Sequence, residues 1–408
     1  MSPMRTDYLS AQEAAAKLGV SLATLYAYVS RGRVDSRPGA DGRSREYSAD
    51  DIGRLIERRQ AGRGAAQAAA HSLAWGLPVL ETNISLIRPL GHYYRGQSAI
   101  ALAESGATLE DIARLLWDCG DQDPFAAAPA QGWSEPVSWL LRDRALPPLA
   151  RMAAALPLLA LDAAHPHSSN PLHRRSYAAQ LLRETAALLC ATHPDAQPIH
   201  QQIAASWRSE ATGLSELVRC ALVLCADHEL NASAFATRVA ASTGASLHAA
   251  ASAGLATLSG PHHGGATARA YAFIQDMLSE QRPADKVRER LQRGDTIPGL
   301  GHPLYADGDP RATTLMKALR ETRPAPVRLA CIEQLAEVTQ ALCGLRPNLD
   351  FALATIASAY ELDAEAAMTI FAAGRMAGWL AHALEQQQSG SLIRPRANYV
   401  GQMPLREE

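Results

Sequence analysis

Apolar residues recur at helical spacing along most of the chain. In 108–116, 149–156 and 371–380 they return every three or four positions, so that they share one face of a helix. The segment 121–136 is interrupted by proline and glycine and is expected to be a loop. Alternating apolar and polar runs long enough for a large sheet do not occur. The pattern therefore predicts a mostly α-helical protein.

The first sixty residues follow a pattern of their own. Ser10 and Glu13 form a capping box, which satisfies backbone donors at the start of a helix, and Gly19 suits the C-terminal end of that helix. Ser21 caps a second helix, which is expected to end near Gly32. Two short helices joined by a tight turn predict a helix-turn-helix.

A hairpin or wing is expected at 37–45, and a third helix from Ser48 to Arg59. With the string AAAKLGVS and the nearby TLY, residues 8–59 resemble the winged helix-turn-helix module of MerR-type regulators and phage excisionases. The resemblance implies a domain at 1–62, which a glycine- and alanine-rich linker at 63–76 would follow.

Four arginines of this module are candidate DNA contacts. Residues 1–63 contain eleven lysines and arginines and eight acidic residues, a net charge of +3, whereas the whole chain carries −2. The chain is therefore not a nucleic-acid binder by bulk charge. The expected phosphate contacts are Arg31, Arg33, Arg43 and Arg45. The alternative is a module that is structural or forms dimer contacts, since an enzyme needs no operator.

Length and composition narrow the class of protein. A chain of 408 residues suits two or three domains. No apolar run reaches the roughly 18 residues of a membrane span, and the N-terminus lacks the apolar core of a signal peptide. The six cysteines are scattered and contain no Cys-x-x-Cys pair, as expected for free thiols. We expect a cytoplasmic enzyme with no membrane partner.

Four polar segments interrupt the apolar helices, at 226–233, 258–266, 297–312 and 347–351. Glycines follow His263 and precede His302, so that a ligand can approach either ring closely. Such histidines can donate hydrogen bonds to a carbonyl oxygen on which charge develops. Asp350 could remove a proton if burial raises its pKa. Together these groups indicate carbon–carbon bond formation through an enolate.

Arginines could bind a dicarboxylic acid, because a guanidinium can form a bidentate pair of hydrogen bonds with a carboxylate. The candidates are Arg311, Arg375 and Arg394. Singly, each piece has an ordinary interpretation: His228 could be a core histidine, Asp350 a helix N-cap, and Arg375 the partner of a nearby acid. A zinc site is disfavoured, since the adjacent His262 and His263 lack ligand spacing.

Taken in order, the motifs closely resemble the citrate synthase family. They are YYRGQSAIALAE, ADHELNAS, GPHHGGA, GLGHPLY with DPRA, PNLDF, and GRMAGWLAHALEQ with LIRPRANYVG. The resemblance extends from about Leu77 to Gly401.

The resemblance implies a Claisen condensation of a short acyl-CoA with oxaloacetate. Asp350 would remove a proton from the acyl carbon, His263 would stabilise the enolate oxygen, and His302 would act on the oxaloacetate carbonyl. The groups that would bind oxaloacetate are His228, Arg311, Arg375 and, from the second subunit of a homodimer, Arg394. No metal or redox cofactor is implied; acetyl-CoA or propionyl-CoA is a substrate, and the product is citrate or 2-methylcitrate.

The resemblance also implies a fold. A large helical domain would comprise 77–266 and 356–408, and a smaller domain at 267–355 would close over the substrates. The alternative is a regulator in which such a body senses metabolites for a DNA-binding module; a sensor, however, has no need of Asp350. Three departures from the family pattern bear on acyl-CoA preference and affinity: 305–308 lacks a basic residue, Pro303 follows His302 where arginine is common, and Thr267 stands where asparagine is usual.

Overall fold

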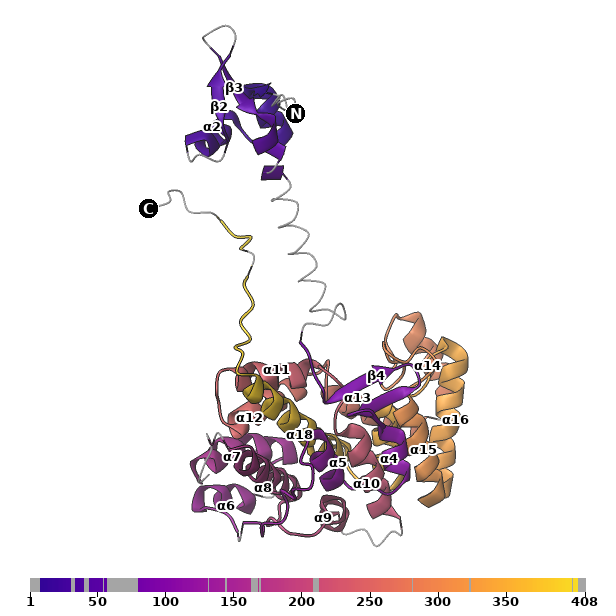
Figure 1. Cartoon of the computed structure of the whole chain (residues 1–408). Coiled ribbons are helices and arrows are strands. Elements are labelled where there is room, and N and C mark those ends of the chain that lie inside the picture. Colours follow the sequence, from indigo (N-terminus) through magenta and orange to yellow (C-terminus); the bar gives the residue numbers. More distant parts are fainter. Residues whose placement is uncertain are drawn as a thin grey trace. The chain divides into compact units, whose positions relative to one another are not determined.

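The computed structural model confirms a mostly helical protein (Figure 1). It describes residues 8–30, 34–39, 44–53, 55–56, 80–130, 132–143, 145–162, 168, 170–207, 213–280, 282–322, 324–397 and 399–402. Contacts divide the chain into two units, one of Met1–Glu81 with Arg396–Glu408 and the other of Thr82–Pro395. The expected linker at 63–76 lies outside the described residues.

The N-terminal unit contains two helices and a small antiparallel sheet. Its elements are β1 (Tyr8–Ser10), α1 (Ala11–Leu18), α2 (Leu22–Ser30), β2 (Ser36–Pro38) and β3 (Arg45–Ser48), with strand order β1-β3-β2. The capping box at Ser10 and Glu13 is present, and Gly19 ends α1 at a φ of 66°. The pairing of β2 with β3 forms the hairpin expected at 37–45, and residues 49–53 and 55–56 are helical.

A small apolar core holds this unit together. Its buried members are Ala14, Ala15, Leu18, Leu25, Val34, Tyr47 and Ile52. They come from both helices, from the residues just before β2, from β3 and from the segment after β3, so the elements expected from the sequence share one core.

The second unit is a helical body with one small antiparallel sheet of strand order β4-β5-β6. Its strands are β4 (Ser85–Arg88), β5 (Gly91–Tyr94) and β6 (Gln97–Ser98). Its helices are α4 (Ala99–Glu104), α5 (Leu109–Leu116), α6 (Glu135–Arg142), α7 (Pro148–Asp162), α8 (Pro171–Cys190), α9 (Ile199–Ser206), α10 (Leu214–Cys225), α11 (Ala232–Ser242), α12 (Leu247–Leu258), α13 (Gly265–Leu278), α14 (Pro283–Gln292), α15 (Pro310–Thr322), α16 (Pro326–Cys343), α17 (Leu349–Ala359) and α18 (Ala364–Ser389). None of the described helices is long and apolar enough to cross a membrane.

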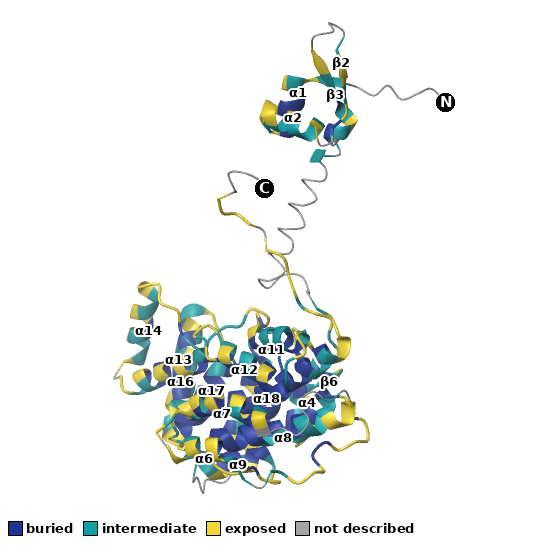
Figure 2. Cartoon of the chain, turned by 90° about the vertical axis from the view of Figure 1, so that its left-hand side faces the viewer, coloured by how far each residue is buried: buried dark blue, intermediate teal, exposed yellow. Residues whose placement is uncertain are grey.

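Helix α18 forms the centre of this body. It contacts α5, α7, α8, α10, α11, α12, α13 and α17. All of its residues from Ala366 to Ala383 are buried, and so is Gln386 (Figure 2). Because a helix covered on all sides exposes no polar face to water, alanine, glycine and large apolar residues dominate it. Its few polar residues are therefore set inside the body.

Two glycines let α18 approach α10 and the loop after it. A Cβ at Gly374 would lie 2.8 Å from the carbonyl oxygen of Leu222, and one at Gly378 would lie 2.6 Å from a carboxylate oxygen of Asp227. Both separations are too short for a side chain. The segment 226–229, one of the polar segments of the sequence, is thus pressed against the central helix.

The predicted smaller domain at 267–355 has apolar clusters of its own. One joins Ala270, Ile274, Ile332, Phe351 and Ala354, and another joins Phe273, Met277, Val287, Ile297 and Leu335. Other residues of the region, such as Leu349 and Leu353, belong to the main core. The contacts place the whole of Thr82–Pro395 in one unit, so a closing domain with these boundaries stays a prediction.

Candidate active site

The polar segments of the sequence meet around a group of aromatic rings. His228, in the loop between α10 and α11, and His302, in the loop before α15, lie edge to face with ring centroids 5.3 Å apart. Tyr305 contacts both: its ring centroid is 4.8 Å from that of His302, and its hydroxyl lies 2.9 Å from Nε2 of His228. The sequence motifs included Tyr305 but gave it no role.

The loop that carries His228 is fixed by the small sheet. The hydroxyl of Ser85 in β4 donates to Asp227 and accepts the N–H of Glu229 at 3.0 Å. On the other side, Nε2 of His382 in α18 lies 3.1 Å from Asp227 Oδ1. Asp227 is fully buried, so it acts as the anchor that holds the adjacent His228 in place.

His302 is a neutral hydrogen-bond donor. Its Nδ1 accepts the backbone N–H of Leu304 at 3.2 Å, so a neutral ring carries its proton on Nε2. Burial, together with the guanidinium of Arg311, lowers the pKa of His302 to about 4. The ring is therefore uncharged at neutral pH and presents one N–H.

His263, in the loop between α12 and α13, is bound to a hydroxyl. Its Nε2 lies 2.7 Å from Ser233 Oγ, which also accepts the indole N–H of Trp379 at 3.0 Å. Burial and the nearby Arg375 lower the pKa of His263 to about 4. This ring, too, is neutral at neutral pH.

Asp350 lies in the first turn of α17. The helix cap is Asn348, whose side chain accepts the N–H groups of Asp350 and Phe351, so Asp350 is not the cap that its sequence context allowed. Its carboxylate accepts a 2.5 Å hydrogen bond from Thr267. Removal from water raises the pKa of Asp350, which makes the carboxylate a stronger base than an exposed aspartate.

Two buried arginines face this group of side chains. Arg311 donates from Nε and Nη2 to the two oxygens of Asp309 at 2.9 and 2.8 Å, which fixes the plane of its guanidinium. Asp309 also accepts the N–H of Leu349, and so ties the start of α15 to that of α17.

Arg375 has unused hydrogen-bonding capacity. Its Nε donates to the carbonyl oxygen of Cys225 at 2.9 Å, not to a neighbouring acid, which the sequence left open. Among the described residues, its buried Nη1 finds no hydrogen-bond partner. Burial lowers the pKa of Arg375, yet a guanidinium stays charged in proteins. A buried cation with an unmet donor favours an anionic ligand.

His92 is a further histidine at the site that the sequence did not single out. It is fully buried in β5, its ring lies 5.7 Å from that of His228, and its Nε2 lies 3.0 Å from the hydroxyl of Tyr94. Burial and Arg311 lower its pKa to about 3. The sequence contained a signal for a role of His92, because this residue directly precedes the motif YYRGQSAIALAE. The burial of His92, however, could not be predicted from the sequence.

The remaining candidates are not gathered at this site. Arg394 is exposed in the extended segment after α18, where the N–H of Ile393 donates to Ser242. Arg45 is exposed in β3 of the N-terminal unit, and Arg31, Arg33 and Arg43 lie outside the described residues.

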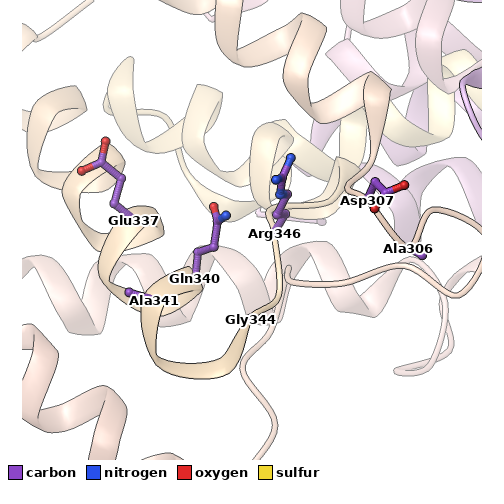
Figure 3. A pocket seen from close by; sticks show the side chains of 7 residues that line it. All are labelled: Ala306, Asp307, Glu337, Gln340, Ala341, Gly344 and Arg346. Carbon is purple, nitrogen blue, oxygen red and sulfur yellow. The ribbon is translucent and has the colours of Figure 1, made fainter.

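An open cavity of about 540 Å³ lies beside the loop that follows His302 (Figure 3). It is lined by Ala306, Asp307, Glu337, Gln340, Ala341, Gly344 and Arg346. The side chain of Arg346 packs over Gly308, where a Cβ would lie 2.9 Å from its Cδ. Arg346 thus places one basic side chain beside 305–308, which has none of its own. Within the described part of the chain, no cluster of histidine, cysteine and acidic side chains is arranged to hold a metal ion.

Comparison with known proteins places these features in a family. The family model described as "Citrate synthase, C-terminal domain" matches residues 73–396, and one described as "Helix-turn-helix domain" matches residues 8–60. The citrate synthase of Haloferax volcanii is 38% identical over 200 residues, and the 2-methylcitrate synthase of Shewanella oneidensis is 35% identical over 198. Each match covers 47% of this chain and 52% of the relative, so the chain matches about half the length of these curated relatives.

Solved structures match over a longer part of the chain. The citrate synthase of Thermoplasma acidophilum, in a ternary complex with carboxymethyl coenzyme A and oxaloacetate, has a TM-score of 0.67 at 22% identity and covers 81% of this chain and 96% of that one. The citrate synthase of Thermotoga maritima has a TM-score of 0.64 at 23% identity, with the same coverage. These likenesses confirm the fold expected from the sequence.

We predict that His263 and His302 stay uncharged down to about pH 5, since burial sets both pKa values near 4. Nitrogen NMR of the histidine side chains measures this, with His263→Asn and His302→Asn to assign the signals. The His302 signal should show the proton on Nε2. A titration midpoint near 6.5 for either ring would contradict the environments described.

Proposed function

Because the chain belongs to the citrate synthase family, we propose that it condenses acetyl-CoA or propionyl-CoA with oxaloacetate and releases CoA. The observation that carries the proposal is one carboxylate of raised pKa, Asp350, held in the same body as two neutral histidines and a buried arginine with an unmet donor. These are the groups that an enolate mechanism requires.

In the first step Asp350 takes a proton from the carbon next to the thioester carbonyl. Negative charge then develops on the thioester oxygen, and His263 donates a hydrogen bond to it. The hydroxyl proton of Ser233 can go to His263 Nε2 or, at 2.8 Å, to Asn231. When it goes to His263, the neutral ring carries its own proton on Nδ1 and can donate from there.

In the second step the enolate carbon attacks the ketone carbon of oxaloacetate. The ketone oxygen gains charge, and the Nε2–H of His302 stabilises it. The alkoxide takes up a proton to become the hydroxyl of the product, and Asp350 gives up the proton that it removed from the acyl carbon. Hydrolysis of the thioester by water then gives citrate or 2-methylcitrate and free CoA. The steps balance without a metal or a redox cofactor.

The arginines supply the binding of oxaloacetate. Arg375 donates from its unpaired Nη1 to one carboxylate of oxaloacetate. Arg311 is oriented by its two hydrogen bonds to Asp309, and the N–H groups that do not bond to Asp309 can donate to oxaloacetate. His228, which contacts Tyr305 and His302, completes the site. Arg346, which packs beside Gly308 and lines the open cavity, is the side chain that we propose to pair with the phosphate groups of the acyl-CoA.

We predict that the protein releases free thiol only when oxaloacetate and a short acyl-CoA are both present. Asp350→Asn keeps the shape of the side chain but removes the base, so turnover should fall by about 10²–10⁴-fold or more. Asp276→Asn, an exposed residue on the same body, is the control and should match wild type. A thiol-release assay decides the matter; wild type inactive with acetyl-, propionyl- and butyryl-CoA would instead favour a metabolite-sensing regulator.

We propose further that two chains form a homodimer with a shared site, to which Arg394 is donated by the partner. Its exposure in an extended segment supports this, because the side chain makes no hydrogen bond or ion pair with the described residues. A dicarboxylate also gains from a third cationic partner.

Co-expression of Asp350→Ala with Arg394→Ala tests the shared site. In a mixed dimer one site collects both defects, and the other combines an intact Asp350 with the partner's intact arginine. Random pairing makes about half of the dimers mixed, so activity should recover to roughly a quarter of wild type. Verified mixed dimers no more active than the separate mutants would place Arg394 within its own chain's site, or in none.

A second candidate function, DNA binding, is supported by the helix-turn-helix match at 8–60. Of the charged side chains of the β2–β3 hairpin, Arg45 is exposed, whereas Arg37 is paired with Glu46 and stacked on Tyr8. The exposed Arg45, with Arg31, Arg33 and Arg43, would contact phosphates.

We predict that the full chain binds duplex DNA at low salt and loses affinity steeply as salt rises, because bound phosphates release counterions. Replacing the four arginines by alanine should abolish the shift in an electrophoretic assay and leave condensation unchanged. Arg293→Ala, exposed on the helical body, is the control for lost charge. No shift at low salt with the wild type would favour a structural role for the module.

A further inference from the structure

Thr267 makes a contact that the proposed mechanism has not used. It lies in the first turn of α13 and is fully buried. Its hydroxyl donates to Oδ1 of Asp350 at 2.5 Å. The two residues stand on helices that pack directly against each other, α13 and α17, so the bond connects them across a helix interface.

The direction of this hydrogen bond is fixed by chemistry. An ionised carboxylate only accepts, so the hydroxyl must donate its single proton. Buried threonines elsewhere in the body donate instead to the carbonyl four residues back in their own helix, as Thr355 does to Phe351 and Thr314 to Pro310. Thr267 differs from these threonines, because its hydroxyl donates to the carboxylate of Asp350.

We propose that Thr267 is the positioning residue of the base: it engages Oδ1 of Asp350, so that Oδ2 is the oxygen that takes the proton from the acyl carbon. The inference rests on the proposed function, because it gives Asp350 the role of base. The threonine is suited to this, since branching at Cβ restricts its χ1 angle and burial leaves the hydroxyl little freedom to turn away.

The same bond acts on the charge of Asp350. The charged groups that influence this carboxyl are Arg311 and Asp309 at the start of α15 and Arg375 on α18. Burial raises its pKa, while the hydrogen bond from Thr267 and the two arginines lower it. Loss of the hydroxyl should therefore raise the pKa of Asp350 further, and the fraction of ionised base should fall on the acid side of the pH profile.

Thr267→Val tests the inference, because it replaces the hydroxyl with a methyl group of similar size. We expect the acid limb of the kcat–pH profile, where kcat falls as pH falls, to move to higher pH by roughly one unit. On that limb kcat should fall about tenfold, with little change in KM for oxaloacetate. Thr267→Ser restores the donor and should return the acid limb to its wild-type position. Deuterium exchange at the acyl carbon, with an unreactive oxaloacetate analogue bound, reports on the proton-transfer step alone.

The outcomes separate the inference from the function on which it rests. Wild type without condensation activity would defeat the proposed function. An active wild type with a folded Thr267→Val variant of unchanged acid limb and exchange rate would overturn the role of Thr267. A loss of kcat that is equal at every pH, with the acid limb of the profile at its wild-type position, would also overturn the role of Thr267. In that case the hydroxyl would not be bonded to the ionised base. Thermal melting checks folding, and Thr267→Ala takes the place of the valine variant if that one does not fold.

Discussion

The close approach of α18 to the end of α10 is the constraint on which the site depends. At Gly374 and Gly378 there is no room for a side chain between the helix and residues 222–227. This contact puts His382 beside Asp227 and lets Arg375 reach the carbonyl of Cys225. About two turns of a buried helix thus fix both the loop that carries His228 and the cation that faces it.

Burial of the imidazole rings themselves determines the state of the histidines. Removal from water disfavours the charged ring, and the nearby guanidinium groups of Arg311 and Arg375 act in the same direction. His228, His263 and His302 are consequently all held with lowered pKa values. A neutral imidazole is a weaker acid than an imidazolium, but it donates a hydrogen bond without repelling the two arginines. The proposed binding of a dicarboxylate and the proposed stabilisation of an enolate therefore call for the same electrostatic arrangement.

The helices could be predicted because their signals are local. The capping boxes at Ser10 and Thr108 and the apolar spacing after them are properties of a few consecutive residues, and both are present. The packing of α18 at the centre could not be predicted in this way. From the sequence, its glycines are expected only to weaken a helix. Their role is to let the segment 222–227 lie directly against α18, and this is evident only from the structure. The same limit applies to the division of 267–355, whose apolar residues serve both their own clusters and the main core.

The candidate site divides along a similar line. The residues found from the sequence, such as His263, His302 and Asp350, stand in motifs whose order is characteristic of a family. The residues that contact them stood in or beside the same motifs but were given no positioning role: Ser233 beside His263, Tyr305 beside His228, and Thr267 beside Asp350. Serine and threonine occur throughout helices, where most bond to their own backbone, so neither their type nor their spacing marks a positioning role. What separates Thr267 from Thr355 is the acceptor that its proton finds. That acceptor lies on another helix, 83 positions away in the sequence, and only the packing of α13 against α17 brings it within reach.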